Sequence, residues 1–187
     1  MPDVARAVHA RPHGYRAGAR RGHNPLMLRF ARMTILCRNL DASLRFYRDT
    51  LGLAVVEEKT LAGAAAGALL RLPPCRMRAA LLAPTPAAPV LLGLFEVSGT
   101  PMDAIEARRD QPLYGQCALV LDTDDFDAVT ARLTAAGVSV LTPPVRYPKA
   151  EASARSPAGL YREMIVHDPD GVLVSVIQVD LLPAAGP

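Results

Sequence analysis

Few side chains in this 187-residue sequence have the types and the spacing that catalysis or metal binding requires. The cysteines Cys37, Cys75 and Cys117 have no CxxC spacing, and His167 is the one histidine beyond the first 29 residues. Protein sites for Zn²⁺ and Fe²⁺ are built from several imidazole, thiolate or carboxylate ligands. The sequence also lacks a phosphate-binding GxxxxGK[ST] loop and a GxSxG nucleophile elbow. These patterns argue against a nucleotide hydrolase, a serine hydrolase and a thiol hydrolase.

The excess positive charge is confined to the start of the chain. Of the 21 basic and 18 acidic side chains, six arginines and one aspartate lie in residues 1–29, so residues 30–187 carry 15 basic and 17 acidic groups. The first segment is rich in Gly, Pro and Arg without apolar periodicity, which predicts a disordered basic tail. Its histidines, His9, His13 and His23, belong to that tail and are not expected to bind metal. An organellar transit peptide and a later start at Met27 or Met33 stay open as alternatives.

Composition limits the partners and the compartment. The 50% hydrophobic content indicates a folded protein, and no apolar run reaches the roughly 20 residues of a membrane-spanning helix, so no membrane partner is expected. Outside the tail there is no basic face with interleaved aromatic residues, so no nucleic-acid partner is expected either. The sparse cysteines predict free thiols and a cytoplasmic location.

Two amphipathic helices are expected, each followed by strands. The first is predicted to begin at Asn39 and end at Gly52, and the second to begin at Asp125 and end at Gly137. Their apolar faces are Leu40, Leu44, Tyr47 and Leu51 in the first, and Phe126, Val129 and Leu133 in the second.

The apolar runs predict a repeated order of one strand, one helix and three strands. We expect strands over 31–38, 53–60, 77–83, 89–97, 115–122, 138–141, 161–167 and 172–179, with loops over 61–75 and 142–157 and a tight turn over 168–171. The prediction is an α+β fold of two βαβββ modules, whose antiparallel or mixed sheets curve around a cleft and carry the helices on their outer faces. The expected parts are a tail over 1–29, modules over 30–100 and 115–180, a linker over 101–114 and a tail over 181–187.

Two motifs within this repeat resemble a known superfamily. Residues 39–53, Asn-Leu-Asp-Ala-Ser-Leu-Arg-Phe-Tyr-Arg-Asp-Thr-Leu-Gly-Leu, and residues 168–175, Asp-Pro-Asp-Gly-Val-Leu-Val-Ser, are similar to the vicinal oxygen chelate superfamily. This superfamily includes glyoxalase I, extradiol dioxygenases and bleomycin-resistance proteins. The resemblance covers roughly residues 30–180. It implies a U-shaped cleft that binds a metal or a small molecule, and a homodimer.

The positions where the superfamily places its metal ligands hold unsuitable residues. The resemblance assigns these positions to Arg32, Gly93, Ala118 and Ser175. None offers an imidazole, a thiolate or a carboxylate, and the guanidinium of Arg32 would oppose a cation. We therefore expect no metal cofactor and a protein that binds a small organic molecule in the cleft. The alternative is a metal-dependent glyoxalase-type lyase or isomerase, or a ring-cleaving dioxygenase, with displaced ligands drawn from Glu96, Glu163 or His167.

Strand alternation then predicts which side chains line the cleft. The expected inward positions are Arg32, Thr34 and Leu36, Gln116, Ala118 and Val120, Leu91, Gly93 and Phe95, and Leu173, Ser175 and Ile177. Arg32 is the expected anchor for a carboxylate or an enolate-like oxygen. The predicted ligand-binding residues are Arg32, Thr34, Phe95, Gln116 and Ser175, with Tyr161 or Arg162 from the seventh strand. A metal-free enzyme with an inward Tyr or Glu as acid or base is a third possibility, and the sequence does not identify the ligand.

Overall fold

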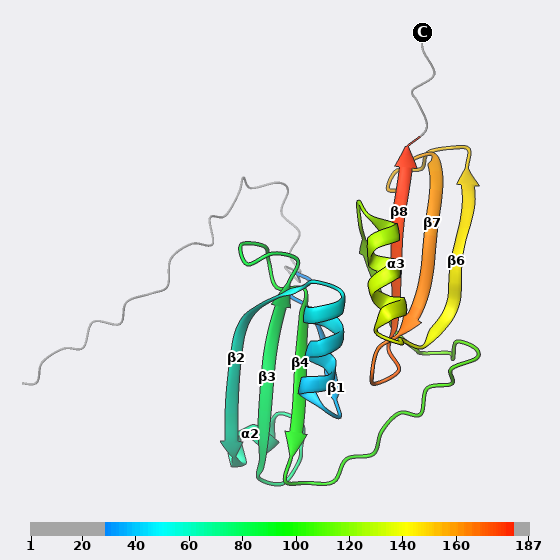
Figure 1. Cartoon of the computed structure of the whole chain (residues 1–187). Coiled ribbons are helices and arrows are strands. Elements are labelled where there is room, and N and C mark those ends of the chain that lie inside the picture. Colours follow the sequence, from blue (N-terminus) through cyan, green and yellow to red (C-terminus); the bar gives the residue numbers. More distant parts are fainter. Residues whose placement is uncertain (1–28, 182–187) are drawn as a thin grey trace, which may run out of the picture. The chain divides into compact units, whose positions relative to one another are not determined.

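The computed structural model describes residues 29–181, so most of both predicted tails lies outside the described residues. Figure 1 shows the helices and strands of this part of the chain. In chain order they are β1 (Met33–Cys37), α1 (Leu40–Leu44), η1 (Arg45–Thr50), β2 (Ala54–Gly63), α2 (Ala64–Ala68), β3 (Cys75–Ala83), β4 (Leu92–Ser98), β5 (Ala118–Asp122), α3 (Phe126–Ala135), β6 (Val140–Lys149), β7 (Gly159–His167) and β8 (Leu173–Leu181).

The strands form two four-stranded mixed sheets with the same topology. The first has the order β1-β4-β3-β2 and the second the order β5-β8-β7-β6. In each sheet the first strand of the module pairs in parallel with the last, and the other pairs are antiparallel. The α+β class and the repeated βαβββ module are confirmed. Each module forms a separate four-stranded sheet.

The helix boundaries follow the predicted capping residues. The side-chain oxygen of Asn39 accepts a hydrogen bond from the backbone N–H of Ala42 at 2.8 Å, and Asp125 caps α3 in the same way. Gly52 adopts a φ of +84°, a conformation that costs glycine little. The first helix differs from expectation in its second half, because η1 is a π-helix that continues directly from α1.

Two predicted loops are wrong in part. Residues 142–157 were expected to form a loop because they include prolines, but β6 extends to Lys149. This strand lies at the edge of its sheet and shifts register twice, so Pro143, Pro144 and Pro148 remove few ladder bonds. In the other loop, β2 continues to Gly63 along β3, and α2 follows it.

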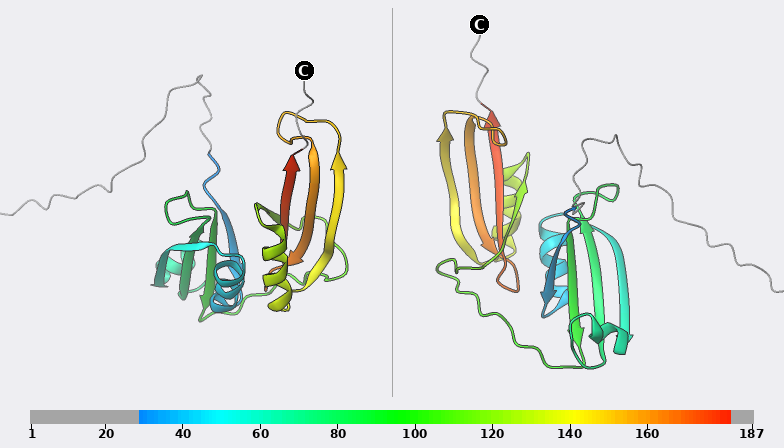
Figure 2. Two further views of the ribbon diagram at one scale, coloured as in Figure 1. Left: turned by 45° about the horizontal axis from the view of Figure 1, so that its top comes forward. Right: turned by 180° about the vertical axis from the view of Figure 1, so that it is seen from behind.

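One core serves both modules, which belong to a single unit of the structure. Figure 2 shows α1 and η1 against one face of the first sheet and α3 against one face of the second. The helix-facing side chains of both sheets pack into the same apolar cluster, which includes Ile35, Leu44, Phe46, Leu94, Val129, Leu133, Met164 and Val174. Each sheet therefore has a second face that points away from this core. We call these two surfaces the open faces.

The turn over residues 168–171 joins the second module to the start of the first helix. The backbone N–H and Nε of Arg38 each donate to Asp170 Oδ1 at 3.0 Å. The hydroxyl of Tyr47 donates to Asp168 Oδ2 at 2.9 Å, and both of these side chains are buried. The turn motif of the sequence therefore has a tertiary role in addition to its local one. No helix in the described part of the chain is long and apolar enough to cross a membrane.

Candidate functional site

The predicted cleft residues of the first module lie on the open face of the first sheet. Ile35 and Cys37 of β1 face the core, so the alternating Thr34 and Leu36 point to the other side. In the β1–β4 register, Thr34 pairs with Gly93 and Leu36 pairs with Phe95. These strands thus bring together residues about 60 positions apart in the sequence.

Gly93 provides the space in which the Arg32 side chain lies. A Cβ atom at Gly93 would be 3.3 Å from Arg32 Nε and 2.8 Å from Cε2 of Phe95. The guanidinium-bearing side chain and the aromatic ring therefore converge on this glycine. Within residues 29–181, Arg32 takes part in none of the ion pairs. The expected anchor is thus exposed on the open face, with its charge uncompensated by a described carboxylate.

A cavity of about 310 Å³ adjoins this group. Its lining includes Leu36, Phe95 and Val97 of the sheet and Met102 and Ile105 of the following linker. The sequence predicted Phe95 and Leu36 for this surface but gave the linker no role. The apolar residues Met102 and Ile105 in this connecting segment were the available signal.

The open face of the second sheet carries a hydrogen-bonded polar cluster. Ser175 donates to Glu163 Oε1 at 2.6 Å, and the hydroxyl of Tyr147 donates to Glu163 Oε2 at 2.7 Å. Tyr147 also stacks on Tyr161, with ring centroids 5.4 Å apart. Burial and the neighbouring Glu163 carboxylate raise the pKa of Tyr147 to about 12. The sequence placed Tyr147 on a loop and did not link it to Glu163.

Two predicted ligand-binding residues are already engaged by other parts of the chain. Of the alternatives on β7, Tyr161 is on the open face, whereas Arg162 is on the helix-facing side and pairs with Asp127 and Asp180. The amide of Gln116 is already engaged, since it accepts from the N–H of Leu113 and donates to the carbonyl of Gly171. Leu91, another expected inward residue, packs against the shared core.

The four positions assigned to metal ligands are equivalent in the two modules. Gly93 pairs with Thr34 and Ser175 pairs with Val120, and Arg32 and Ala118 precede those partners by two residues each. None of the four supplies a metal-binding donor suited to Zn²⁺ or Fe²⁺.

The proposed displaced ligands do not gather either. Glu96 accepts from the backbone N–H of Leu40 at 2.6 Å, Glu163 is held by Ser175, and His167 is the last residue of β7. Among the described residues, no three His, Cys, Asp or Glu side chains form a group that could hold a metal ion. The residues present therefore do not fit the metal centre of the superfamily.

Comparisons with solved structures show the same fold. A glyoxalase family protein from Bacillus cereus is 21% identical, with a TM-score of 0.65 over 82% of this chain and 95% of that one. A glyoxalase/dioxygenase from Nostoc punctiforme is 16% identical, with a TM-score of 0.53 over 87% and 99%. The trypanothione-dependent glyoxalase I of Leishmania major is 17% identical, with a TM-score of 0.52 over 81% and 86%.

Sequence comparison agrees with the fold. No curated protein matches the sequence. Residues 29–176, which include both βαβββ modules up to the middle of β8, match a single family profile. The chain therefore belongs to the Glyoxalase/Bleomycin resistance protein/Dioxygenase superfamily.

Proposed function

We propose that this protein binds a small organic molecule on the open face of the first sheet without a metal ion. The observation that carries the proposal is the Arg32 side chain, which lies over Gly93 beside the Phe95 ring and has no described ion-pair partner. A guanidinium group binds a carboxylate through two parallel hydrogen bonds. The ligand that fits best has an apolar body for the Phe95 cavity and a carboxylate or enolate-like oxygen for Arg32.

The ligand site is completed, in this proposal, by a second copy of the chain. The two open faces of one chain point away from the core that they share, so they cannot enclose one ligand between them. Both faces expose apolar side chains, with Leu36 at 44% and Val120 at 60%. The faces also have complementary charge, because Arg32 lies on one and Glu163 on the other. A homodimer that pairs the first face of one copy with the second face of its partner satisfies both features.

We place this homodimer in the cytoplasm. Cys37, Cys75 and Cys117 are free thiols, and burial raises the pKa of Cys37 to about 11. A buried thiol with a raised pKa stays protonated and unreactive. A reducing compartment suits a chain with one exposed and two buried thiols.

Substitution of Arg32 tests the ligand. In chelator-treated protein, at least one member of a panel of aryl and alkyl carboxylates should raise the melting temperature, and Arg32→Gln should weaken its binding about 10- to 100-fold by loss of a charge-assisted bidentate contact. Isothermal titration calorimetry measures the affinity. Arg76→Gln is the matched control, because Arg76 is an exposed arginine of β3 in the same sheet. Equal affinities of the Arg32→Gln variant and wild type would contradict the proposed anchor.

The alternative function is a metal-dependent glyoxalase- or dioxygenase-type enzyme. One observation favours it, since the Glu163 carboxylate is bound to Ser175 at one of the four assigned positions. Mass spectrometry of protein purified without chelator distinguishes the two functions. Near-stoichiometric Zn²⁺, Ni²⁺, Mn²⁺ or Fe²⁺, together with thermal stabilisation by the same ion, would replace our proposal with the alternative. Metal-free protein that binds a carboxylate would support our proposal of a metal-independent binding protein.

Substitution of Val120 tests the dimer. Wild-type protein should sediment at twice the 20.0 kDa mass of one chain, whereas Val120→Asp should sediment as a monomer because it places a charge in an apolar interface. The control is Leu69→Asp, at a position that is 79% exposed and lies next to α2. Sedimentation of the wild type as a monomer at about 100 µM, far above the dissociation constant of a stable dimer, would contradict the composite site.

A further inference from the structure

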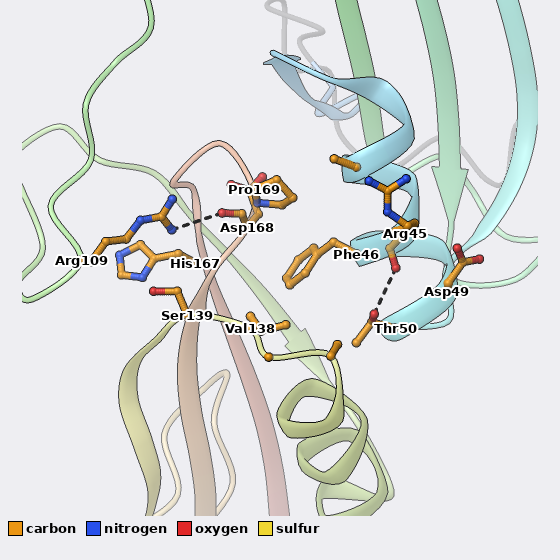
Figure 3. Close-up of a pocket in the computed structure, with 13 residues that line it drawn as sticks. Arg45, Phe46, Asp49, Thr50, Arg109, Val138, Ser139, His167, Asp168 and Pro169 are labelled. Carbon is orange, nitrogen blue, oxygen red and sulfur yellow. Dashed lines mark hydrogen bonds between the residues drawn. The ribbon is translucent and has the colours of Figure 1, made fainter.

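A second cavity lies where η1 faces the segment between α3 and β6 and the end of β7. Its volume is about 540 Å³, within the range of small-molecule sites. Figure 3 shows it between η1 and the segment that joins α3 to β6. The residues that line it are Ala42, Arg45, Phe46, Asp49, Thr50, Arg109, Ala136, Gly137, Val138, Ser139, His167, Asp168 and Pro169. Neither the sequence motifs nor the proposed cleft assigns a function to this cavity.

Two arginines and two aspartates line this cavity, and the two arginines have no ion-pair partner within the described part of the chain. Arg45 and Arg109 form no ion pair with any described residue. The two acidic residues of the lining are already engaged: Asp49 is bound by Arg48 at 2.6 Å, and Asp168 accepts the hydroxyl of Tyr47. The cavity thus presents guanidinium groups without counter-ions, an arrangement that favours an anionic ligand.

His167 adds an unsatisfied polar group to the same wall. Its side chain is only 2% exposed, and neither ring nitrogen has a hydrogen-bond partner among the described residues. Burial and the positive charge of Arg109 lower the pKa of His167, although the nearby carbonyls of Arg108 and Ser139 oppose that shift. The ring is therefore neutral at neutral pH and has one N–H to donate. A buried imidazole without partners is costly, so a ligand that bonds to it gains affinity.

The lining separates into a polar end and an apolar middle. Figure 3 shows the His167 ring beside the Arg109 side chain, with the Ser139 hydroxyl on the same side. Val138 lies next to Ser139, and Phe46 lies on the other side of the Asp168–Pro169 segment; both belong to the lining of the cavity. A ligand with an anionic group at one end and a compact apolar body would match this lining. The anionic group would meet the polar end, and the apolar body would meet the apolar middle.

We propose that this cavity binds a small organic anion, a carboxylate or a phosphate ester attached to an apolar body. Arg109 and Ser139 hold the anionic group, and His167 donates its ring N–H to it. Phe46 and Val138 contact the apolar body. This site shares no residue with the Arg32 face, so it is independent of the ligand proposed there.

The His167 ring is a direct reporter of binding. Phenyl phosphate, benzoate and neutral benzyl alcohol are titrated into the full chain while the histidine ring resonances are followed by NMR, and His167→Gln identifies the resonance among those of His9, His13 and His23. The two anions should shift the His167 signal saturably with dissociation constants below about 1 mM. The pKa of His167 should rise in the complex, because a bound anion stabilises the imidazolium. Benzyl alcohol should bind at least about ten-fold more weakly.

Neighbouring arginines supply the matched variants. Arg109→Gln should weaken phenyl phosphate binding about ten-fold or more, whereas Arg108→Gln should not change it, because Arg108 pairs with Asp110 in the same linker. Arg32→Gln should also leave it unchanged, which separates this test from that of the cleft. The proposal is overturned by three results: no saturable His167 shift with either anion up to about 10 mM, equal binding of benzyl alcohol, or wild-type affinity in Arg109→Gln. Inorganic phosphate that binds as tightly as phenyl phosphate would overturn the assignment of Phe46 and Val138.

Discussion

Replacement of Asp168 by alanine is expected to lower the free energy of unfolding by about 3 kcal/mol, because it leaves several buried donors without an acceptor. Asp168 is 1% exposed, and its Oδ1 accepts from the backbone N–H groups of Asp170 at 2.9 Å and Val172 at 2.7 Å. Its Oδ2 accepts the hydroxyl of Tyr47, which is fully buried. Urea unfolding followed by circular dichroism measures the loss.

A double-mutant cycle with Tyr47→Phe isolates the contact between the modules. Tyr47→Phe alone should cost about 1 kcal/mol, and the double variant should be more stable than the sum of the two single effects predicts, because one hydrogen bond is counted in both. Asp168→Asn is the conservative control, since it retains one acceptor oxygen and should cost less than alanine. Additive effects in the cycle would show that the Tyr47–Asp168 bond is not formed in solution.

The buried Asp168 carboxyl group should also affect how the free energy of unfolding depends on pH. Burial raises the pKa of Asp168 above its ordinary value of 3.8, although its hydrogen bonds from Tyr47 and the backbone oppose the shift. The folded state therefore holds this proton more tightly than the unfolded state. Between 3.8 and the raised pKa, this group makes the protein less stable as pH rises. Asp168→Ala should lack that contribution, so the difference in stability between wild type and variant should be larger at the low-pH end of the window.

Replacement of Gly67 by alanine is the second change expected to have a large effect, at about 3 kcal/mol of unfolding free energy. A Cβ atom at Gly67 would lie 2.5 Å from the carbonyl oxygen of Leu72 and would also overlap the carbonyl of Pro73. These are backbone atoms, and the Gly67 carbonyl is itself bound by the N–H groups of Leu70 and Leu72. The clash cannot be relieved by a side-chain rotation, so the backbone of α2 or of the Leu72–Pro73 segment must shift, which disturbs the packing of α2 over β3.

Thiol reactivity reports that movement directly. Ala66 of α2 packs over Cys75 and Met77, and Cys75 is only 6% exposed. Wild-type protein should show one fast-reacting thiol, the exposed Cys117, and Gly67→Ala should show a second from Cys75. Ala65→Ser is the control, because Ala65 is an exposed position of the same helix. A Gly67→Ala variant with one fast thiol and wild-type stability would contradict the described packing of α2.

The first sheet shows which geometric expectation from the sequence agrees with the structure. Alternation along β1 and β4 predicted that Arg32, Thr34 and Phe95 would share a face, and a Cβ at Gly93 would indeed meet the first and last of these. The prediction worked because the side-chain period of a strand is a local property. It was less informative on β7, where Tyr161 and Arg162 are adjacent and one of them must face the helix. Only the pairing of Arg162 with Asp127 and Asp180 shows which one does.

Features that depend on local chemistry were determined by the sequence itself. Asn39 and Asp125 cap their helices through bonds to N–H groups three residues away, and the turn over 168–171 closes on its own residues. These contacts need no partner from elsewhere in the chain, so residue types and spacing were sufficient to predict them. The repeated module, and with it the fold class, follows from the same local signals.

The tertiary structure decided which residues far apart in the sequence contact, bury or hydrogen-bond one another. Prolines are tolerated in β6 because the strand lies at a sheet edge, and Gln116 is unavailable to a ligand because the turn at Gly171 uses its amide. The His167 cavity brings together segments up to about 125 positions apart, and the shared core turns both open faces outward. Such outcomes depend on which surfaces are buried together, and burial is set by the whole chain rather than by any one segment.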